Sequence, residues 1–129
     1  MSDHHSIAFS LTARTGGAAL DFYQRAFGAE VVERFDTPGG GLPHAELRIG
    51  NTCFYLSDES PKWHATALPP GTLAPCVFAL RVPDIEAAFR RAVEAGATVL
   101  CAVHDEPGPL LHDPFGYRWT FHPAASASP

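Results

Sequence analysis

The sequence predicts an α+β fold made of two βαβββ modules in tandem. Three observations predict it: segments in which apolar and polar residues alternate, two stretches with apolar residues at helical spacing, and the return of the whole pattern 66 positions later. With 129 residues, 46 % of them hydrophobic and 18 % charged, the chain has the size and composition of one globular domain. Residues 1–129 are therefore expected to form one domain with two related halves.

The first module opens with a strand and a helix. Apolar and polar residues alternate over Ile7–Thr12, as in a half-buried strand. Thr15 or Gly16 can cap the helix that follows, and Gly28 can end it. Its apolar stripe consists of Ala19, Phe22, Tyr23, Ala26 and Phe27. A second strand is predicted over Ala29–Phe35.

The next two strands form a hairpin around the two-residue turn Gly50-Asn51. The register of this hairpin pairs Arg48 with Cys53, Glu46 with Tyr55 and His44 with Ser57. Alternation then places apolar residues on one face: Ala45, Leu47, Ile49, Phe54 and Leu56. The other face carries His44, Glu46, Arg48, Cys53, Tyr55 and Ser57. We expect the first face to be core and the second to be the wall of a polar cavity.

The second module repeats this order after a segment rich in proline and glycine. A strand is predicted over Cys76–Val82, and Pro83-Asp84 can start a helix that ends near Gly96. Its apolar stripe, Ile85, Ala88, Phe89, Ala92 and Val93, lies 66 positions after that of the first helix. Further strands are expected over 98–102, 110–113 and 117–121. The boundaries are about 7–57 for module one, 58–74 for the linker, 75–122 for module two and 123–129 for a flexible tail.

A tight turn precedes the last strand. Asp113, Pro114 and Gly116 occupy positions i, i+1 and i+3 of a type I turn, in which the aspartate hydrogen-bonds the turn backbone. After the turn, Trp119 and Phe121 are predicted to face the core, which leaves Thr120 on the opposite face. The turn therefore closes the second module and orients its last strand.

Charge and cysteine content limit the possible partners and location. The formal net charge is −5, and the few lysines and arginines are scattered, so we expect no nucleic-acid partner. No apolar run approaches the ~18 residues of a membrane span, and no membrane partner is expected. Cys53, Cys76 and Cys101 lie far apart in apolar runs, which is typical of reduced core thiols in a cytoplasmic protein.

Four segments of the sequence carry distinctive motifs: Asp21–Glu30, His44–Gly50, Ala92–Ala97 and Asp113–Trp119. Together they resemble the vicinal oxygen chelate (VOC) superfamily of glyoxalases, bleomycin-resistance proteins and dioxygenases, especially its small PhnB-like members. This resemblance implies that the two modules form a cup-shaped, mostly antiparallel sheet with the helices outside and a small-molecule site inside. It also implies a homodimer, in which modules could be exchanged between subunits.

The resemblance also implies a divalent metal held by four His or Glu side chains. The four matching positions here are Ala8, Tyr55, Val77 and Thr120, and none is a conventional ligand for such a metal. Among neighbours on the same strand faces, only His122 could coordinate a metal. We therefore expect no metal and no other cofactor.

The expected ligand-binding residues are His44, Glu46, Arg48, Tyr55, Arg118 and Thr120. His44 and Glu46, two apart on one strand, point into the same space and could be an acid/base pair or ligands of a relocated metal site. Alternatively they belong to a polar wall in which Glu46 pairs with Arg48. Arg118 could anchor an anionic group, or it could cap backbone carbonyls. Trp63 and His64 could cover the cup or lie at a dimer interface.

The leading hypothesis for function is a small-molecule binding protein of the glyoxalase/bleomycin-resistance type without the usual metal site. One alternative is an enzyme of the same superfamily, a lyase, isomerase, dioxygenase or thiol transferase, that uses His44 and Glu46 in a relocated site. A further alternative is a dimeric regulatory or partner-binding module. The sequence does not identify the ligand.

Overall fold

The structure is a computed structural model that describes residues 5–124. Most of the predicted tail, 123–129, thus lies outside the described residues. Its contacts divide the chain into two compact units. Unit 1 comprises residues up to 20 together with 29–67, and unit 2 comprises 21–28 together with the residues from 68 onward. The boundary runs through the first helix, α1 (Gly16–Phe27), so this helix contributes to both units.

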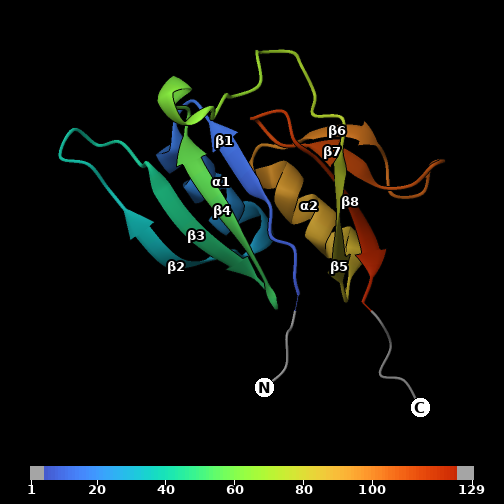
Figure 1. Cartoon of the computed structure of the whole chain (residues 1–129). Helices are drawn as coiled ribbons and strands as arrows, with labels where there is room; N and C mark the ends of the chain where they lie inside the picture. Colours follow the sequence, from blue (N-terminus) through green and yellow to red (C-terminus); the bar gives the residue numbers. More distant parts are fainter. Residues whose placement is uncertain (1–4, 125–129) are drawn as a thin grey trace. The chain divides into compact units, whose positions relative to one another are not determined.

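Unit 1 contains one four-stranded mixed sheet with the order β1-β4-β3-β2, drawn in blue to green in Figure 1. Its strands are β1 (Ser10–Ala13), β2 (Glu30–Phe35), β3 (His44–Ile49) and β4 (Thr52–Asp58). β1 runs parallel to β4, and the other two pairs are antiparallel. The hairpin of β3 and β4 has the predicted register, with Glu46 opposite Tyr55 and Arg48 opposite Cys53.

One face of this sheet is core, as the alternation predicted. The side chains that face it are at most 2 % exposed: Leu11, Ala45, Leu47, Phe54 and Leu56. Burying each leucine or phenylalanine side chain in this set stabilises the unit by roughly 1.5–3 kcal/mol. The residues between them in β3 and β4 are half-buried or exposed, so the sheet is apolar on one side and polar on the other.

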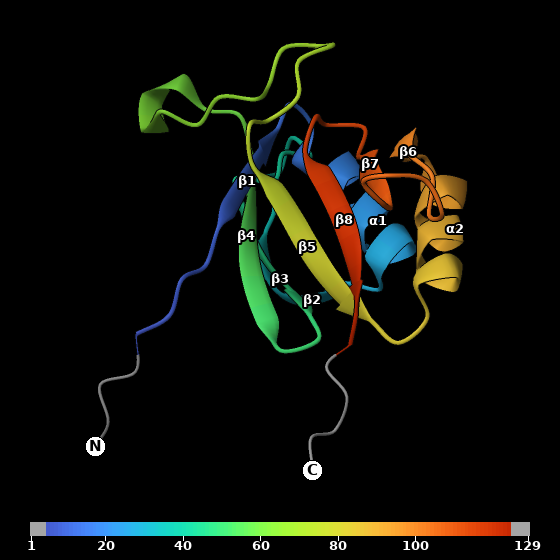
Figure 2. The same ribbon diagram turned by 90° about the vertical axis from the view of Figure 1, so that its right-hand side faces the viewer.

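Unit 2 contains a second four-stranded mixed sheet with the order β5-β8-β7-β6. Its elements are β5 (Val77–Val82), α2 (Ile85–Ala95), β6 (Thr98–Cys101), β7 (Leu110–His112) and β8 (Arg118–Pro123). Figure 2 shows β5 beside β8, as in the parallel pair β1 and β4 of unit 1. The strand orders of the two sheets correspond one to one, which confirms the predicted repeat of two modules.

The core of unit 2 is aromatic. The ring centroid of Trp119 lies 4.5 Å from that of Phe27 in α1 and 5.0 Å from that of Phe78 in β5. Phe121 packs edge-on against Phe89 of α2 at 5.7 Å. Trp119 and Phe121 are each 2 % exposed, which confirms their predicted core positions. Aromatic pairs of this geometry add about 0.5–1.5 kcal/mol each beyond the area that they bury.

The predicted turn at Asp113 is also confirmed. The backbone N–H of Gly116 donates to the carbonyl of Asp113 over 3.2 Å, and the Asp113 carboxylate accepts from the N–H groups of Phe115 and Tyr117. Gly116 has φ +98°, and a Cβ atom there would lie 2.7 Å from the carbonyl oxygen of Thr72. Only glycine fits this position without strain.

Three local predictions differ from the structure. The first strand begins at Ser10, because Ile7 is 94 % exposed and contributes nothing to the core. The linker contains a short 3₁₀-helix, η1 (Pro61–Trp63). The three cysteines are free, but the prediction that they are core thiols is wrong, since Cys76 is exposed and the other two are half-buried. Cys53, for example, lies on the polar side of β4, because only alternate residues of a strand face the core.

Within residues 5–124, no helix is long and apolar enough to cross a membrane.

Candidate functional site

The side of the unit 1 sheet that faces away from the core carries most of the predicted site. We call it the polar face, and it consists of Glu30, Glu33 and Phe35 of β2, His44, Glu46 and Arg48 of β3, and Cys53 and Tyr55 of β4. Figure 1 shows these three strands side by side. Residues opposite each other in a sheet point to the same side, so the strand pairing gathers these side chains. Four of the six predicted ligand contacts thus share one surface.

Three aromatic rings form a row across the polar face. The ring centroid of His44 lies 5.8 Å from that of Phe35 and 5.7 Å from that of Tyr55. Phe35 is 54 % exposed and Tyr55 37 % exposed. Large aromatic side chains that are this exposed contribute little to a core, and they provide flat apolar area for binding. We call these three residues the aromatic row.

A bulge in β2 places a third carboxylate, that of Glu33, on the polar face beside those of Glu30 and Glu46. Val31 pairs with Leu47, but the next pair is Glu33 with Glu46, so Val32 is the extra residue. Without the bulge, Val32 would lie opposite Glu46. Bulges of this kind often lie next to functional sites, where they reorient a side chain. Here the bulge also brings Phe35 opposite His44.

The arginine of the polar face already has a partner. Arg48 donates to the carboxylate of Glu30 on β2, an exposed ion pair. The alternative in which Arg48 pairs with Glu46 is thus not what the structure shows. Within the described residues no ion pair involves Glu33 or Glu46. The centre of the polar face therefore has two carboxylates without a cationic partner.

Cys53 lies at the edge of this acidic centre. Desolvation, followed by the hydrogen bond to Glu46 and the charge of that carboxylate, raises the pKa of the Cys53 thiol above its ordinary value. The thiol is thus kept protonated at neutral pH, which makes it a poor nucleophile. Cys53 is therefore a poor candidate for a nucleophile at the polar face.

Two of the six predicted ligand contacts, Arg118 and Thr120, lie in unit 2, and both donate hydrogen bonds to backbone carbonyls. Arg118 donates from Nε to the carbonyl of Ala74 over 3.1 Å and from Nη2 to that of Pro75 over 3.0 Å. The hydroxyl of Thr120 donates to the carbonyl of Pro109 over 2.6 Å. These bonds hold the segments that precede β5 and β7. They favour the alternative in which Arg118 caps carbonyls.

The sequence reasoning missed Glu33 and Phe35. Their place on the polar face depends on the bulge, and strict alternation along β2 gives no sign of it. The only signal is the pair Val31-Val32, two adjacent apolar residues that interrupt the alternation.

Trp63, a candidate for covering the site, is 74 % exposed and has the ammonium of Lys62 5.5 Å from its ring centroid.

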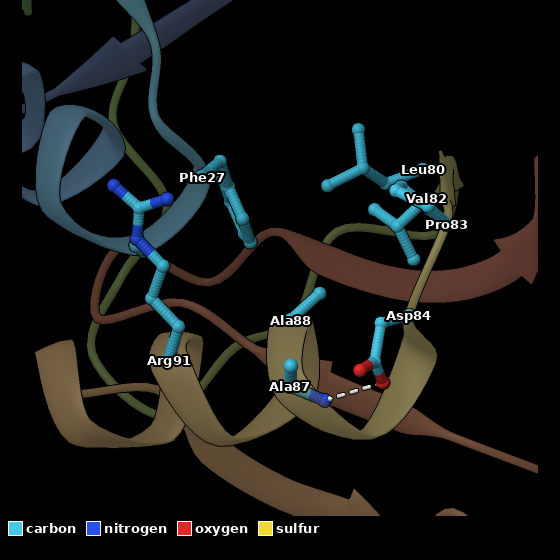
Figure 3. Close-up of a pocket in the computed structure, with 9 residues that line it drawn as sticks. Phe27, Leu80, Val82, Pro83, Asp84, Ala87, Ala88 and Arg91 are labelled. Atoms are coloured by element: carbon cyan, nitrogen blue, oxygen red, sulfur yellow. Dashed lines mark hydrogen bonds between the residues drawn. The ribbon is translucent and has the colours of Figure 1, made fainter.

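A cavity of about 310 Å³ in unit 2 lies elsewhere, between the C-terminal part of α1, the end of β5 and the start of α2 (Figure 3). Its wall is mostly apolar, with Phe27 and Leu80 among its side chains. Both charged residues in the wall serve the fold. Asp84 accepts from the N–H of Ala87 at the start of α2, and Arg91 donates to the carbonyl of Arg25. The cavity therefore has few polar groups left to orient a ligand.

The residues present do not fit the divalent metal site that the resemblance implies. The four matching positions offer a methyl group, a phenol, an isopropyl group and the hydroxyl that is bound to Pro109, none of them an imidazole or a carboxylate. Within residues 5–124, no group of three or more His, Cys, Asp or Glu side chains is arranged to hold a metal ion. We therefore derive no step of the function through a metal.

Comparison with known proteins gives matches over most of the chain. A sequence model described as "Glyoxalase/Bleomycin resistance protein/Dioxygenase superfamily" matches residues 5–121. An uncharacterised protein of Mycobacterium bovis is 36 % identical over 117 residues, which cover 85 % of this chain and 77 % of that protein.

Solved structures show the same fold. A gene product from Arabidopsis thaliana superposes with a TM-score of 0.74 and 25 % identity, over 92 % of this chain and 98 % of that one. The fosfomycin resistance protein FosX from Listeria monocytogenes, solved with Mn(II) and a sulfate ion, has a TM-score of 0.69. It is 12 % identical over 98 % of this chain and 94 % of its own, so the similarity concerns the fold alone.

Proposed function

Because the chain belongs to the Glyoxalase/Bleomycin resistance protein/Dioxygenase superfamily, we propose that it is a small-molecule binding protein of this type that does not use the usual divalent metal. The ligand would bind on the polar face of β2, β3 and β4. His44, Glu46, Arg48 and Tyr55 are the contacts that the geometry supports best. The same fold carries many unrelated activities, so this proposal depends on the site and not on the fold.

The observation that supports the proposal most strongly is the contrast between the two sides of one sheet. Leu47 and Phe54 on one side have no exposed surface, while their sequence neighbours Glu46 and Tyr55 lie side by side on the other. A sheet face that served only as a solvated surface would need no row of exposed rings. Rings with carboxylates beside them form a surface that combines apolar contact with a few oriented polar groups, as ligand sites do.

Three further features of the function remain proposals. Arg118 and Thr120 are proposed as additional contacts, beside the backbone carbonyls to which they donate. Homodimerisation is proposed because β6 is an edge strand that exposes Val99 and Leu100. A cytoplasmic location is proposed on the basis of the three free cysteines.

A thermal-shift screen of small organic compounds tests the proposed function. A ligand present at about 100 times its dissociation constant should raise the free energy of unfolding by about 2.7 kcal/mol and the melting temperature accordingly. We expect Tyr55→Ala and His44→Ala to weaken binding of such a compound at least about tenfold, because each removes a ring of the aromatic row.

His104→Ala is the matched control, since this histidine lies on a loop of unit 2 and is exposed. It should leave the shift unchanged. A compound whose stabilising effect is the same in wild type, Tyr55→Ala and His44→Ala would place the ligand elsewhere and contradict the proposed site. A screen in which no compound stabilises the wild-type protein would contradict the proposed function itself.

A further inference from the structure

We infer that the ligand of the polar face is a planar aromatic cation. This inference rests on the proposed function and names the chemical class of its ligand. It depends on two independent features of unit 1, the aromatic row and the unpaired carboxylates beside it.

The shape of the ligand follows from the aromatic row. Phe35, His44 and Tyr55 lie on three adjacent strands, with neighbouring centroids less than 6 Å apart and interplanar angles of 36° and 31°. Rings with centroids this close cannot lie in one plane, so neighbouring rings pack partly face to face, and the row ends in the exposed rings of Phe35 and Tyr55. A flat ring system can continue this stack on an end ring, whereas a branched aliphatic ligand would touch it at fewer points.

The charge of the ligand follows from the neighbouring row of the sheet. Glu33, Glu46 and Tyr55 lie opposite one another across β2, β3 and β4. Like charges directly opposite each other in a sheet destabilise it. The bulge in β2 creates this unfavourable pair, although the plain register would have placed Val32 there.

Within the described residues, no ion pair compensates the two carboxylates. Arg48, the nearest arginine in the strand register, pairs with Glu30 one row further along. A bound cation would relieve the repulsion between Glu33 and Glu46, while a bound anion would increase it.

Both features act on the same molecule. A cationic ring that stacks on Tyr55 gains from the negative face of that ring as well as from the carboxylate of Glu46 beside it. Glu46 lies directly opposite Tyr55 in the register, so the two contacts do not compete for different poses. A neutral planar ligand would use the aromatic row but leave the carboxylates unpaired.

Fluorescence titrations with two acridines test the inference. Proflavine is a planar cation at neutral pH, and acridine-9-carboxylate carries an anionic group on the same ring system. We expect proflavine to bind about tenfold more tightly than acridine-9-carboxylate, from two charge contacts at a half-exposed site. In the double variant Glu33→Gln and Glu46→Gln this preference should disappear.

The double variant also has a readout that separates binding from folding. Removing two like charges should leave its stability to urea equal to or above that of wild type, so a loss of binding would not be due to unfolding. Glu94→Gln, on the exposed surface of α2, is the control and should keep the preference for proflavine. Tyr55→Ala should weaken binding of both acridines.

Three results would overturn the inference. If the two acridines bind equally well and both lose affinity in Tyr55→Ala, the aromatic row binds planar ligands without regard to charge, and the proposed function stands. If neither acridine binds, or if the preference for proflavine persists in the double variant, the inference fails, and the thermal-shift screen decides the proposed function separately.

Discussion

Replacing Asp113 with alanine is expected to lower the free energy of unfolding by about 3–5 kcal/mol. This side chain has no exposed surface, although it is a carboxylate. It accepts four hydrogen bonds, two from the backbone of the turn and two from aromatic side chains of unit 2. The hydroxyl of Tyr23 donates over 2.5 Å and the indole Nε1 of Trp119 over 3.0 Å. Alanine would leave all four donors without this acceptor, and burial makes each loss costly.

The pKa shifts of Asp113 and Tyr23 reflect the cost of burying a carboxylate away from water. Burial raises the pKa of Asp113 above its ordinary value, although its four hydrogen bonds lower it. Burial and the nearby charge of Asp113 raise the pKa of Tyr23 well above its ordinary value. The carboxylate therefore depends on its donors, and it ties the turn to α1 through Tyr23.

Urea denaturation of the wild type and the variants measures this effect. Tyr23→Phe removes one donor and should cost about 1.5–3 kcal/mol, which keeps the test informative if Asp113→Ala does not fold. Asp105→Ala, on an exposed loop, is the control and should change stability by no more than about 0.5 kcal/mol. Equal stability of wild type and Tyr23→Phe would show that the buried network does not hold the unit together.

Replacing Asp58 with alanine is expected to lower the free energy of unfolding of unit 1 by about 2–3 kcal/mol. The Asp58 carboxylate accepts from the N–H of Gly16 over 2.6 Å and from that of Leu42 over 2.7 Å. The first bond satisfies a free N–H group at the start of α1, where a negative charge is also favoured by the helix dipole. The second fixes the loop that leads into β3, on which the polar face depends.

Circular dichroism during urea denaturation checks this prediction. Asp21→Ala is a matched control. Asp21 forms an ion pair with Arg25, but both side chains are exposed, so this pair contributes little to the free energy of unfolding. A stability loss in Asp58→Ala no larger than that in Asp21→Ala would mean that water replaces the carboxylate at the helix start. Asp58→Asn should lie between the two, since it keeps one acceptor oxygen.

Much of the fold could be predicted because it depends on local patterns. The helical stripe that begins at Ala19, the two-residue turn Gly50-Asn51 and the return of both patterns 66 positions later each follow from spacing along the chain. The register that brings Glu46 opposite Tyr55 follows from the length of that turn, and the structure has it. The sharing of α1 between two units is a tertiary property, and no local pattern predicts it.

The features that the sequence did not predict depend on contacts between distant residues or on a single inserted residue. Asp113 was recognised as a turn residue, but its bond to Tyr23 joins positions 90 residues apart. The bulge at Val32 shifts the rest of β2 by one residue, which moves Glu33 and Phe35 onto the polar face. For Arg118 the sequence left two roles open, and the structure favours the one in which it caps carbonyls, whereas the bond from Thr120 to the carbonyl of Pro109 was not anticipated.

Calorimetric titration of chelator-treated protein with a ligand found in the screen tests the central proposal most directly. The account predicts that the affinity for the ligand is the same before and after chelation and that added Mn²⁺ or Zn²⁺ does not change it, because the polar face binds through its rings and carboxylates. Loss of binding after chelation, with recovery when the metal is returned, would contradict a metal-independent site.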